Sequence, residues 1–326
     1  MDPRRILITG AGGFVGRHLL EALARAFPEA SLLATGDPAG DGAGDGAGGG
    51  ITRMDVTDGA AVLAAVEELR PDAVVHLAAV AAVPEANREA GRAWRVNFRG
   101  TRHLARAVLA KAPEARFLYV SSAAVYGRSF RSGEPMGEDA PLEPLDTYAA
   151  TKAASEMALS AMTSEGLRLV RLRPFNHIGP GQSPSFAVAA FAGQIARIEA
   201  GMQAPELAVG SLKPERDFLD VRDVVAAYAA TLARADELPA GIAINLASGV
   251  PRRIGAVLDE LLALARVRIS VRTDPARLRS DELMRSVGDP ARAKGLLGWE
   301  PKIPWETTLA DILADCRREV GRATTL

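Results

Sequence analysis

The chain has 326 residues, a formal net charge of -1 and a hydrophobic content of 48%. Such a composition supplies a full core and excludes a globally disordered chain, and the balanced charge gives no basic bias that would favour a nucleic-acid partner. The single cysteine, Cys316, excludes an internal disulfide and a thiol-rich metal site. We expect no bound metal. No apolar run approaches the roughly 18 residues needed to cross a membrane, and no signal-peptide pattern follows Met1. We therefore expect a cytoplasmic protein without a membrane partner.

Short apolar runs alternate with helical stretches along the first 121 residues of the chain. The runs that favour strands are 6–8, 31–35, 73–77 and 117–121, and the stretches that favour helices are 13–27, 60–69 and 94–110. Strands that alternate with helices indicate parallel pairing through right-handed crossovers. Apolar runs without polar alternation are typical of strands buried on both faces. The pattern therefore predicts an α/β fold with a Rossmann-like, doubly wound parallel sheet.

The segment TGAGGFVG, residues 9–16, joins the first predicted strand to the first predicted helix. Gly10, Gly13 and Gly16 allow a tight turn, a close approach of the backbone to a pyrophosphate, and close packing of helix on strand. The helix that follows offers unpaired N–H groups to an anion. This position in the chain predicts a binding site for a nicotinamide dinucleotide, NAD(P)(H).

The choice between NAD and NADP depends on the end of the second strand, where an acidic residue favours NAD and a basic residue favours NADP. Asp37 lies near that position, which gives NAD a slight preference and leaves NADP open. Asp55 and Val56 lie where a third strand would contact adenine, although Asp55 is equally explained as a turn residue. Residues 36–50 are rich in Gly and Ala and predict a flexible surface loop, either on the cofactor side or without function.

Tyr148 and Lys152 lie one helical turn apart, so both project from one face of a predicted helix that Asp146 or Thr147 can cap. A phenol has a reference pKa near 10, and a nearby ammonium is expected to lower that pKa toward the range of a general acid or base. Ser122 follows the fourth predicted strand, at the edge where parallel sheets bind ligands. We identify Ser122, Tyr148 and Lys152 as candidate catalytic residues, with Ser122 also holding the substrate oxygen.

Asn97, in RVNFRGT, could support the lysine through a water molecule, or it could be an amide that packs helices together. A Tyr–Lys pair in isolation would also fit an exposed helix surface. The glycine turn and the serine-bearing strand in the same chain favour the catalytic interpretation.

These motifs resemble, in order and spacing, the extended short-chain dehydrogenase/reductase family, also known as the nucleotide-sugar epimerase/dehydratase superfamily. The resemblance runs nearly end to end, through residues 9–16, 74–79, 96–101, 121–127, Tyr148 and Lys152, 173–182, 216–223 and 297–301. It implies that the cofactor contacts include, beside the three glycines and the Tyr–Lys pair, Phe14, Val15, Asp37, Asp55, Val56, Leu77, Ala78, Ala79 and Asn97.

The stretch RPFNHIGPGQ, residues 173–182, resembles the branch that contains GDP-4-keto-6-deoxy-mannose reductases and GDP-mannose 4,6-dehydratases. The dehydratases usually carry an acidic residue after the catalytic Ser or Thr, where this chain has Ala123 and Ala124, and a methyl group cannot move a proton. The resemblance therefore implies reduction of a GDP-linked 4-keto-6-deoxy sugar with Tyr148 as general acid, or C4 epimerisation with tightly bound NAD.

The same resemblance implies a nucleotide-sugar site in the second half of the chain. Asn176 would contact the diphosphate, and Arg216 would pair with phosphate, a task that suits guanidinium geometry. Arg279 and Glu282, in LRSDEL, match a family pattern whose members contact the nucleoside. A local ion pair of Arg216 with Asp217 is the competing interpretation.

We expect a dinucleotide-binding Rossmann domain formed by residues 1–172 and 213–247. A smaller C-terminal α/β domain, 173–212 with 248–326, would bind the nucleotide sugar, with the site in the cleft between them. The resemblance also implies a homodimer through a four-helix interface of 94–110 and 147–165. A cofactor-binding regulator and a scaffold protein remain alternatives, but neither requires the proton-transfer residues.

Overall fold

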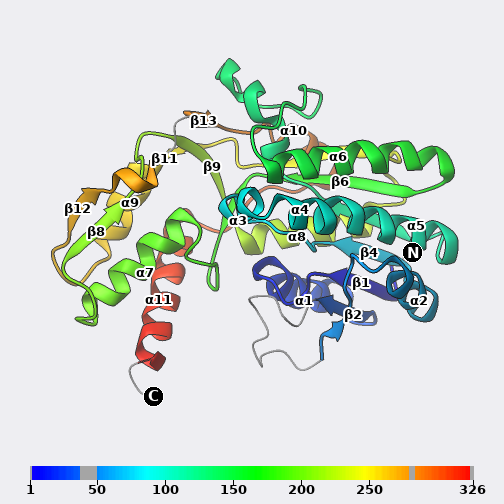
Figure 1. Ribbon diagram of the computed structural model, residues 1–326, viewed down its shortest axis with the longest axis horizontal. Coiled ribbons are helices and arrows are strands. Elements are labelled where there is room, and N and C mark those ends of the chain that lie inside the picture. Colours follow the sequence, from blue (N-terminus) through cyan, green and yellow to red (C-terminus); the bar gives the residue numbers. More distant parts are fainter. Residues whose placement is uncertain (1, 37–49, 279–282, 324–326) are drawn as a thin grey trace.

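The computed structural model describes residues 2–36, 50–278 and 283–323. A seven-stranded sheet forms its centre, in the order β10-β6-β5-β4-β1-β2-β3 (Figure 1). All its neighbouring strands pair in parallel. The strands are β1 Arg5–Thr9, β2 Ser31–Gly36, β3 Thr52–Arg53, β4 Ala73–His76, β5 Arg116–Val120, β6 Arg168–Pro174 and β10 Ile242–Leu246. The predicted Rossmann-like parallel sheet is confirmed.

Helices cover both faces of this sheet. One face carries α1 Phe14–Ala26, α8 Val221–Arg234 and α10 Ala291–Leu297, and the other carries α2 Gly59–Leu69, α5 Thr101–Lys111 and α6 Thr147–Met162. Strand β1 shows the reason, because Ile6 and Ile8 belong to the first core and Leu7 to the second. A strand buried on both faces has no polar alternation, as the sequence predicts.

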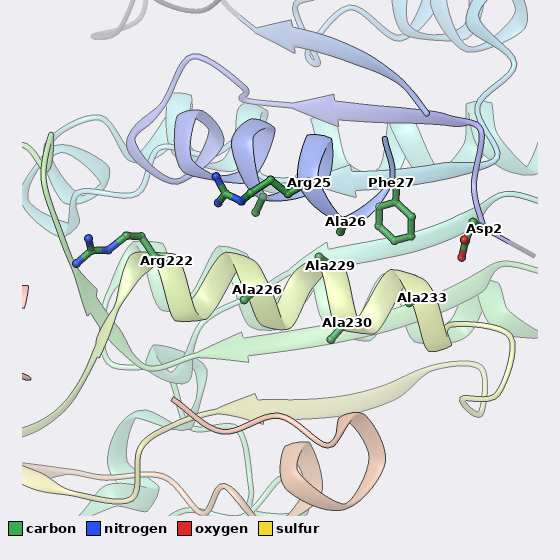
Figure 2. Close-up of a pocket in the computed structure, with 10 residues that line it drawn as sticks. Asp2, Arg25, Ala26, Phe27, Arg222, Ala226, Ala229, Ala230 and Ala233 are labelled. Atoms are coloured by element: carbon green, nitrogen blue, oxygen red, sulfur yellow. The ribbon is translucent and has the colours of Figure 1, made fainter. Parts of the chain in front are cut away.

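Helices α1 and α8 lie side by side, and small side chains face the groove between them (Figure 2). The groove has a volume of about 460 Å³. It is lined by Asp2, Ala22, Arg25, Ala26, Phe27, Arg222, Ala226, Ala229, Ala230 and Ala233. None of the predicted site residues lines this groove, which is therefore not the candidate site.

A smaller substructure lies beside the sheet (Figure 1). A four-stranded sheet contains β7 Asn176–Ile178, β9 Glu215–Asp220, β11 Pro251–Arg253 and β13 Arg285–Ser286, and a second pair contains β8 Glu206–Val209 and β12 Ser270–Thr273. A third core forms around these strands. The helices that pack on it are α7 Ala187–Glu199, α9 Ile254–Ala263 and α11 Trp305–Ala323.

The remaining elements are short. They are α3 Val83–Arg88, α4 Ala90–Ala93, the π-helix η1 Trp94–Gly100, and the 3-10 helices η2 Ala123–Ser132, η3 Thr163–Glu165 and η4 Pro275–Arg277. The helix predicted over 94–110 is therefore two elements, because η1 is wound more widely than the α5 that continues it. None of the helices in the described ranges is long and apolar enough to cross a membrane.

Two segments connect the substructures across the predicted domain boundaries. Strand β9 pairs with β7, β11 and β13, although the predicted division assigns residues from 213 onward to the Rossmann domain. Conversely, Ala293, Leu297 and Trp299 pack into the core of the large sheet with α8, although they lie beyond residue 248. The division into 1–172 with 213–247 and 173–212 with 248–326 stays a prediction.

Helix α6 begins at a capped end. The Asp146 carboxylate accepts a hydrogen bond from the Ala149 amide at 2.8 Å, as the sequence predicts for one of two possible caps. We expect Asp146→Ala to lower the free energy of unfolding by about 1 kcal/mol, because an amide of the first turn loses its acceptor. Urea unfolding of the purified variant measures this change. Asp146→Asn is the matched control, since asparagine is an equally good cap, and an equal loss in that variant would contradict the capping role.

Candidate active site

The glycine turn after β1 has the geometry of a nucleotide cradle. Gly10 has a φ of +72°, and a Cβ there would lie 2.8 Å from the Ala78 amide nitrogen. A Cβ at Gly16 would lie 2.4 Å from the Ala11 carbonyl oxygen. Helix α1 starts after Gly13, which has no side chain to occupy the first amides. The turn therefore leaves room for a pyrophosphate against the helix N-terminus, and these residues fit a dinucleotide.

The end of β4 forms the neighbouring wall. The Leu77 amide donates to the Thr9 carbonyl at 3.1 Å, and the Ala78 amide lies 3.4 Å from the Thr9 hydroxyl. Phe14 and Val15, the first two residues of α1, are partly buried and pack against the core beneath that helix. The parallel register therefore brings the glycine turn and residues 77–79 together at the carboxyl edge of the sheet, while their contact with a cofactor stays a prediction.

The predicted adenine contacts have different surroundings. The Asp55 carboxylate accepts a hydrogen bond from the Thr57 amide at 2.8 Å, and this bond lowers the pKa of Asp55. That contact is typical of a turn residue, the competing interpretation for Asp55. Val56 is buried against Gly100. Asp37 lies outside the described residues.

A buried hydrogen-bond chain centred on His76 links three elements under this edge. The His76 Nδ1 lies 2.6 Å from the Thr9 hydroxyl, and its Nε2 lies 2.8 Å from the Thr101 hydroxyl. The Thr101 hydroxyl donates to the Asn97 carbonyl at 2.6 Å, so Nε2 carries the proton and Nδ1 accepts from Thr9. Burial lowers the pKa of His76 to about 3. A neutral imidazole thus fixes the ends of β1 and β4 against α5.

Asn97 packs helices together. Its side chain donates to the Val80 carbonyl at 3.1 Å and to the Thr151 hydroxyl at 3.0 Å, and its oxygen accepts from the Val80 amide at 2.7 Å. Its carbonyl accepts from the hydroxyls of Thr101 and Ser155. These contacts favour the interpretation as a packing amide, and the role of Asn97 toward lysine or cofactor stays a prediction.

Ser122 and Tyr148 face each other across the end of β5. Ser122 follows β5 and accepts a hydrogen bond from the Ala124 amide at 3.1 Å, while Tyr148 lies in the first turn of α6. Burial raises the pKa of Tyr148 to about 12, and the hydrogen bond with Ser122 opposes that rise. The expectation that the pKa of Tyr148 is lowered is wrong, because burial disfavours the charged phenolate and raises the pKa instead. A phenol that stays protonated at neutral pH suits a proton donor.

Lys152 is 3% exposed, and its Nζ donates to the Val120 carbonyl at 2.7 Å. The ammonium lies 5.0 Å from the centre of the Tyr119 ring. Burial lowers the pKa of Lys152 to about 7, and the negative charge of Glu156 opposes that shift. Ser122, Tyr148 and Lys152 thus converge at the carboxyl edge, between β5 and α6.

The predicted substrate residues lie on the small sheet. Asn176 is exposed on β7, whose register places it opposite Phe218 of β9, two residues after Arg216. The Asp217 carboxylate accepts from the amides of Ser248, Gly249 and Gly288, and both interpretations of Arg216, the phosphate contact and the local ion pair, stay predictions. Arg279 and Glu282 lie outside the described residues, so their predicted nucleoside contacts stay predictions.

Sequence analysis missed Tyr119 and Glu156, which flank the lysine. Glu156 was detectable in principle, since it lies one helical turn after Lys152, whereas no local pattern places the Tyr119 ring beside the lysine. The described residues contain no group of three or more His, Cys, Asp or Glu side chains placed to hold a metal ion.

A doubly wound sheet with this glycine turn and this Ser–Tyr–Lys arrangement defines a nicotinamide-dependent enzyme of the short-chain dehydrogenase/reductase type. The chain belongs to the NAD dependent epimerase/dehydratase family, whose sequence model matches residues 6–247. The family predicted from the motifs is thereby confirmed.

Relatives match the chain over nearly its whole length. GDP-6-deoxy-D-mannose reductase of Pseudomonas aeruginosa is 38% identical over 97% of this chain and 98% of the relative. dTDP-4-dehydrorhamnose reductase of Streptomyces griseus is 32% identical over 98% and 97%. Among solved structures, RMD from Pseudomonas aeruginosa complexed with NADPH has a TM-score of 0.84 at 36% identity, covering 97% of this chain and 99% of that chain. UDP-glucose 4-epimerase of Thermus thermophilus in complex with NAD has a TM-score of 0.83 at 29% identity, covering 96% and 99%.

The cradle yields a direct prediction. We expect Gly16→Ala to abolish measurable dinucleotide binding, because the new methyl group would have to displace the Ala11 carbonyl and with it the turn. Titration of the protein fluorescence with NADPH and NADH measures the dissociation constants. Gly137→Ala is the control, since a Cβ there meets nothing within 4 Å, and its affinity should equal that of the unmodified chain. Undiminished binding by Gly16→Ala would contradict the assigned cradle.

Proposed function

We propose that the protein catalyses the NAD(P)H-dependent reduction of a nucleotide-linked 4-keto-6-deoxy sugar of the GDP-4-keto-6-deoxy-mannose type. The observation that carries the proposal is the phenol of Tyr148, held protonated beside the Ser122 hydroxyl at the carboxyl edge of the sheet. The full-length similarity to the Pseudomonas aeruginosa GDP-6-deoxy-D-mannose reductase supports the substrate class.

Each residue of the site has a part in this reaction. The Ser122 hydroxyl donates a hydrogen bond to the ketone oxygen and orients the carbonyl beside Tyr148. Tyr148 gives its proton to that oxygen as negative charge develops there, the role of a general acid. The ammonium of Lys152 stabilises the phenolate that results. A dinucleotide bound in the cradle would supply the hydride that the carbonyl carbon receives.

Ala123 and Ala124 help to choose among the chemistries of the family. Both follow Ser122 at the start of η2, and neither methyl group can remove the proton that a 4,6-dehydration requires. This supports a reaction at the carbonyl alone. We assign diphosphate contacts to Asn176 and Arg216, and nucleoside contacts to Arg279 and Glu282, as part of the same proposal.

Two observations bear on the choice between NAD and NADP, and they point in different directions. The slight preference for NAD rests on Asp37, whereas the similar Pseudomonas aeruginosa structure is a complex with NADPH. A second candidate function, a nucleotide-sugar 4-epimerase with tightly bound NAD, uses the same three catalytic residues. The similarity to the Thermus thermophilus UDP-glucose 4-epimerase supports this second candidate.

We further propose a homodimer through η1, α5 and α6. Met157 of α6 is 69% exposed and Trp94 of η1 is 39% exposed, and large exposed apolar side chains on the predicted contact helices fit a shared interface. A cytoplasmic location stays a prediction from the sequence.

Replacing Tyr148 tests the proposal. We expect Tyr148→Phe to keep its fold and its affinity for the dinucleotide while kcat falls roughly 10²–10⁴-fold, because the general acid is lost. Consumption of NADPH with GDP-4-keto-6-deoxy-mannose, followed by absorbance, measures kcat. Tyr228→Phe is the matched control: its hydroxyl is buried without a hydrogen-bond partner among the described residues, and its turnover should be unchanged. Equal turnover by Tyr148→Phe and the unmodified chain would refute the role of Tyr148.

A further inference from the structure

The Lys152 ammonium lies in a place where burial favours the neutral amine. Its Nζ has one hydrogen-bond acceptor among the described residues, the Val120 carbonyl. A neutral amine would stabilise the Tyr148 phenolate far less than an ammonium does, because only the ammonium carries a positive charge that attracts the negative phenolate. Something in the surroundings must therefore oppose the effect of burial.

The ring of Tyr119 is the first such group. Tyr119 is 0% exposed on β5, and the face of its ring lies 5.0 Å from Nζ, measured to the ring centre. The negative face of an aromatic ring attracts a cation, and this attraction is strongest where water is excluded. An uncharged amine gains much less from the same contact. The ring therefore favours the protonated lysine.

The carboxylate of Glu156 is the second group. Glu156 is 0% exposed on α6, one helical turn after Lys152. Arg173 donates to the Glu156 carboxylate from Nε at 3.0 Å and from Nη2 at 2.6 Å. The Nη1 of Arg171 lies 3.2 Å from Oε2 of the same carboxylate. These guanidiniums hold the Glu156 carboxylate in place, and its negative charge raises the pKa of Lys152.

The other ionisable groups around the lysine do not supply this negative charge. His76 on β4 is neutral, since its pKa is about 3, and burial keeps the Tyr148 phenol protonated. Arg171 and Arg173 on β6 carry positive charge and would disfavour a second cation if Glu156 were removed. The protonated form of Lys152 therefore depends on Tyr119 and Glu156.

We propose that the Tyr119 ring and the Glu156 carboxylate keep Lys152 in its ammonium form and so set the upper pH limit of the site. Both are positioning residues, which act on the reaction only through Lys152. The consequence for turnover rests on the proposed function, whereas the protonation of Lys152 is measurable without any substrate.

Direct titration of Lys152 tests the proposal. The chain has five lysines, Lys111, Lys152, Lys213, Lys294 and Lys302, so its lysine ¹³Cε NMR signals are few, and Lys152→Met assigns the one of interest. We expect this signal to titrate with a midpoint near the pKa of about 7 in the unmodified protein. In Tyr119→Leu the midpoint should fall by about one pH unit, because the cation–π contact is lost. Tyr119→Phe is the matched control, since it keeps the ring and should keep the midpoint.

Glu156→Gln gives an independent measurement and should also lower the midpoint, because the positive charges of Arg171 and Arg173 remain. Circular dichroism checks that each variant is folded, and Tyr119→Met replaces Tyr119→Leu if the latter does not fold. An unchanged midpoint in the folded Tyr119 or Glu156 variant would overturn the role of that residue. The pH profile of turnover separates the two proposals: its basic limb should shift with the midpoint, and a shifted midpoint without any reductase activity would contradict the proposed function alone.

Discussion

A lysine charge held inside the protein is the constraint on which the rest of the site depends. The end of β5 supplies the Val120 carbonyl, the same strand supplies the Tyr119 ring, and α6 supplies both Lys152 and Glu156. Because Glu156 is buried, it needs Arg173, which in turn contacts the Tyr126 hydroxyl. A buried ion pair contributes little net stability but is costly to break. The network is therefore best understood as a support for one ammonium.

The parallel sheet places this support beside the nucleotide cradle. In a doubly wound sheet the carboxyl ends of the strands lie at one edge, and ligands bind where the strand order reverses. Here that point lies between β1 and β4, where Gly10 approaches Ala78 and His76 links the strand ends. Helix α6 begins near the same edge, with Tyr148 in its first turn and Lys152 bonded to the Val120 carbonyl at the end of β5. One edge thus brings together residues that are far apart in the sequence.

Local patterns predicted much of this arrangement. The apolar runs predicted the strands, and the glycine spacing predicted the turn after the first strand. The four-residue spacing of Tyr148 and Lys152 predicted that both lie on one face of a helix. Quantities that depend on burial were not predictable, since the pKa of Tyr148 is raised where the sequence suggested a decrease. Other features depend on contacts between distant segments. These are the partners of Asn97, the Tyr119 ring beside Lys152, and the pairing of β9 with β7, β11 and β13. No local pattern reports such contacts.

The fate of the nicotinamide cofactor tests the central claim most directly. The purified protein is first analysed for bound dinucleotide and is then mixed with GDP-4-keto-6-deoxy-mannose and either NADH or NADPH, with the absorbance of the reduced form followed over time. The account predicts loss of reduced cofactor in a one-to-one ratio with the sugar product, which would also name the preferred dinucleotide. No consumption of reduced cofactor, in protein that already contains bound dinucleotide, would contradict the reductase and favour the epimerase, which is then tested by inversion at C4 of GDP-, UDP- and dTDP-hexoses.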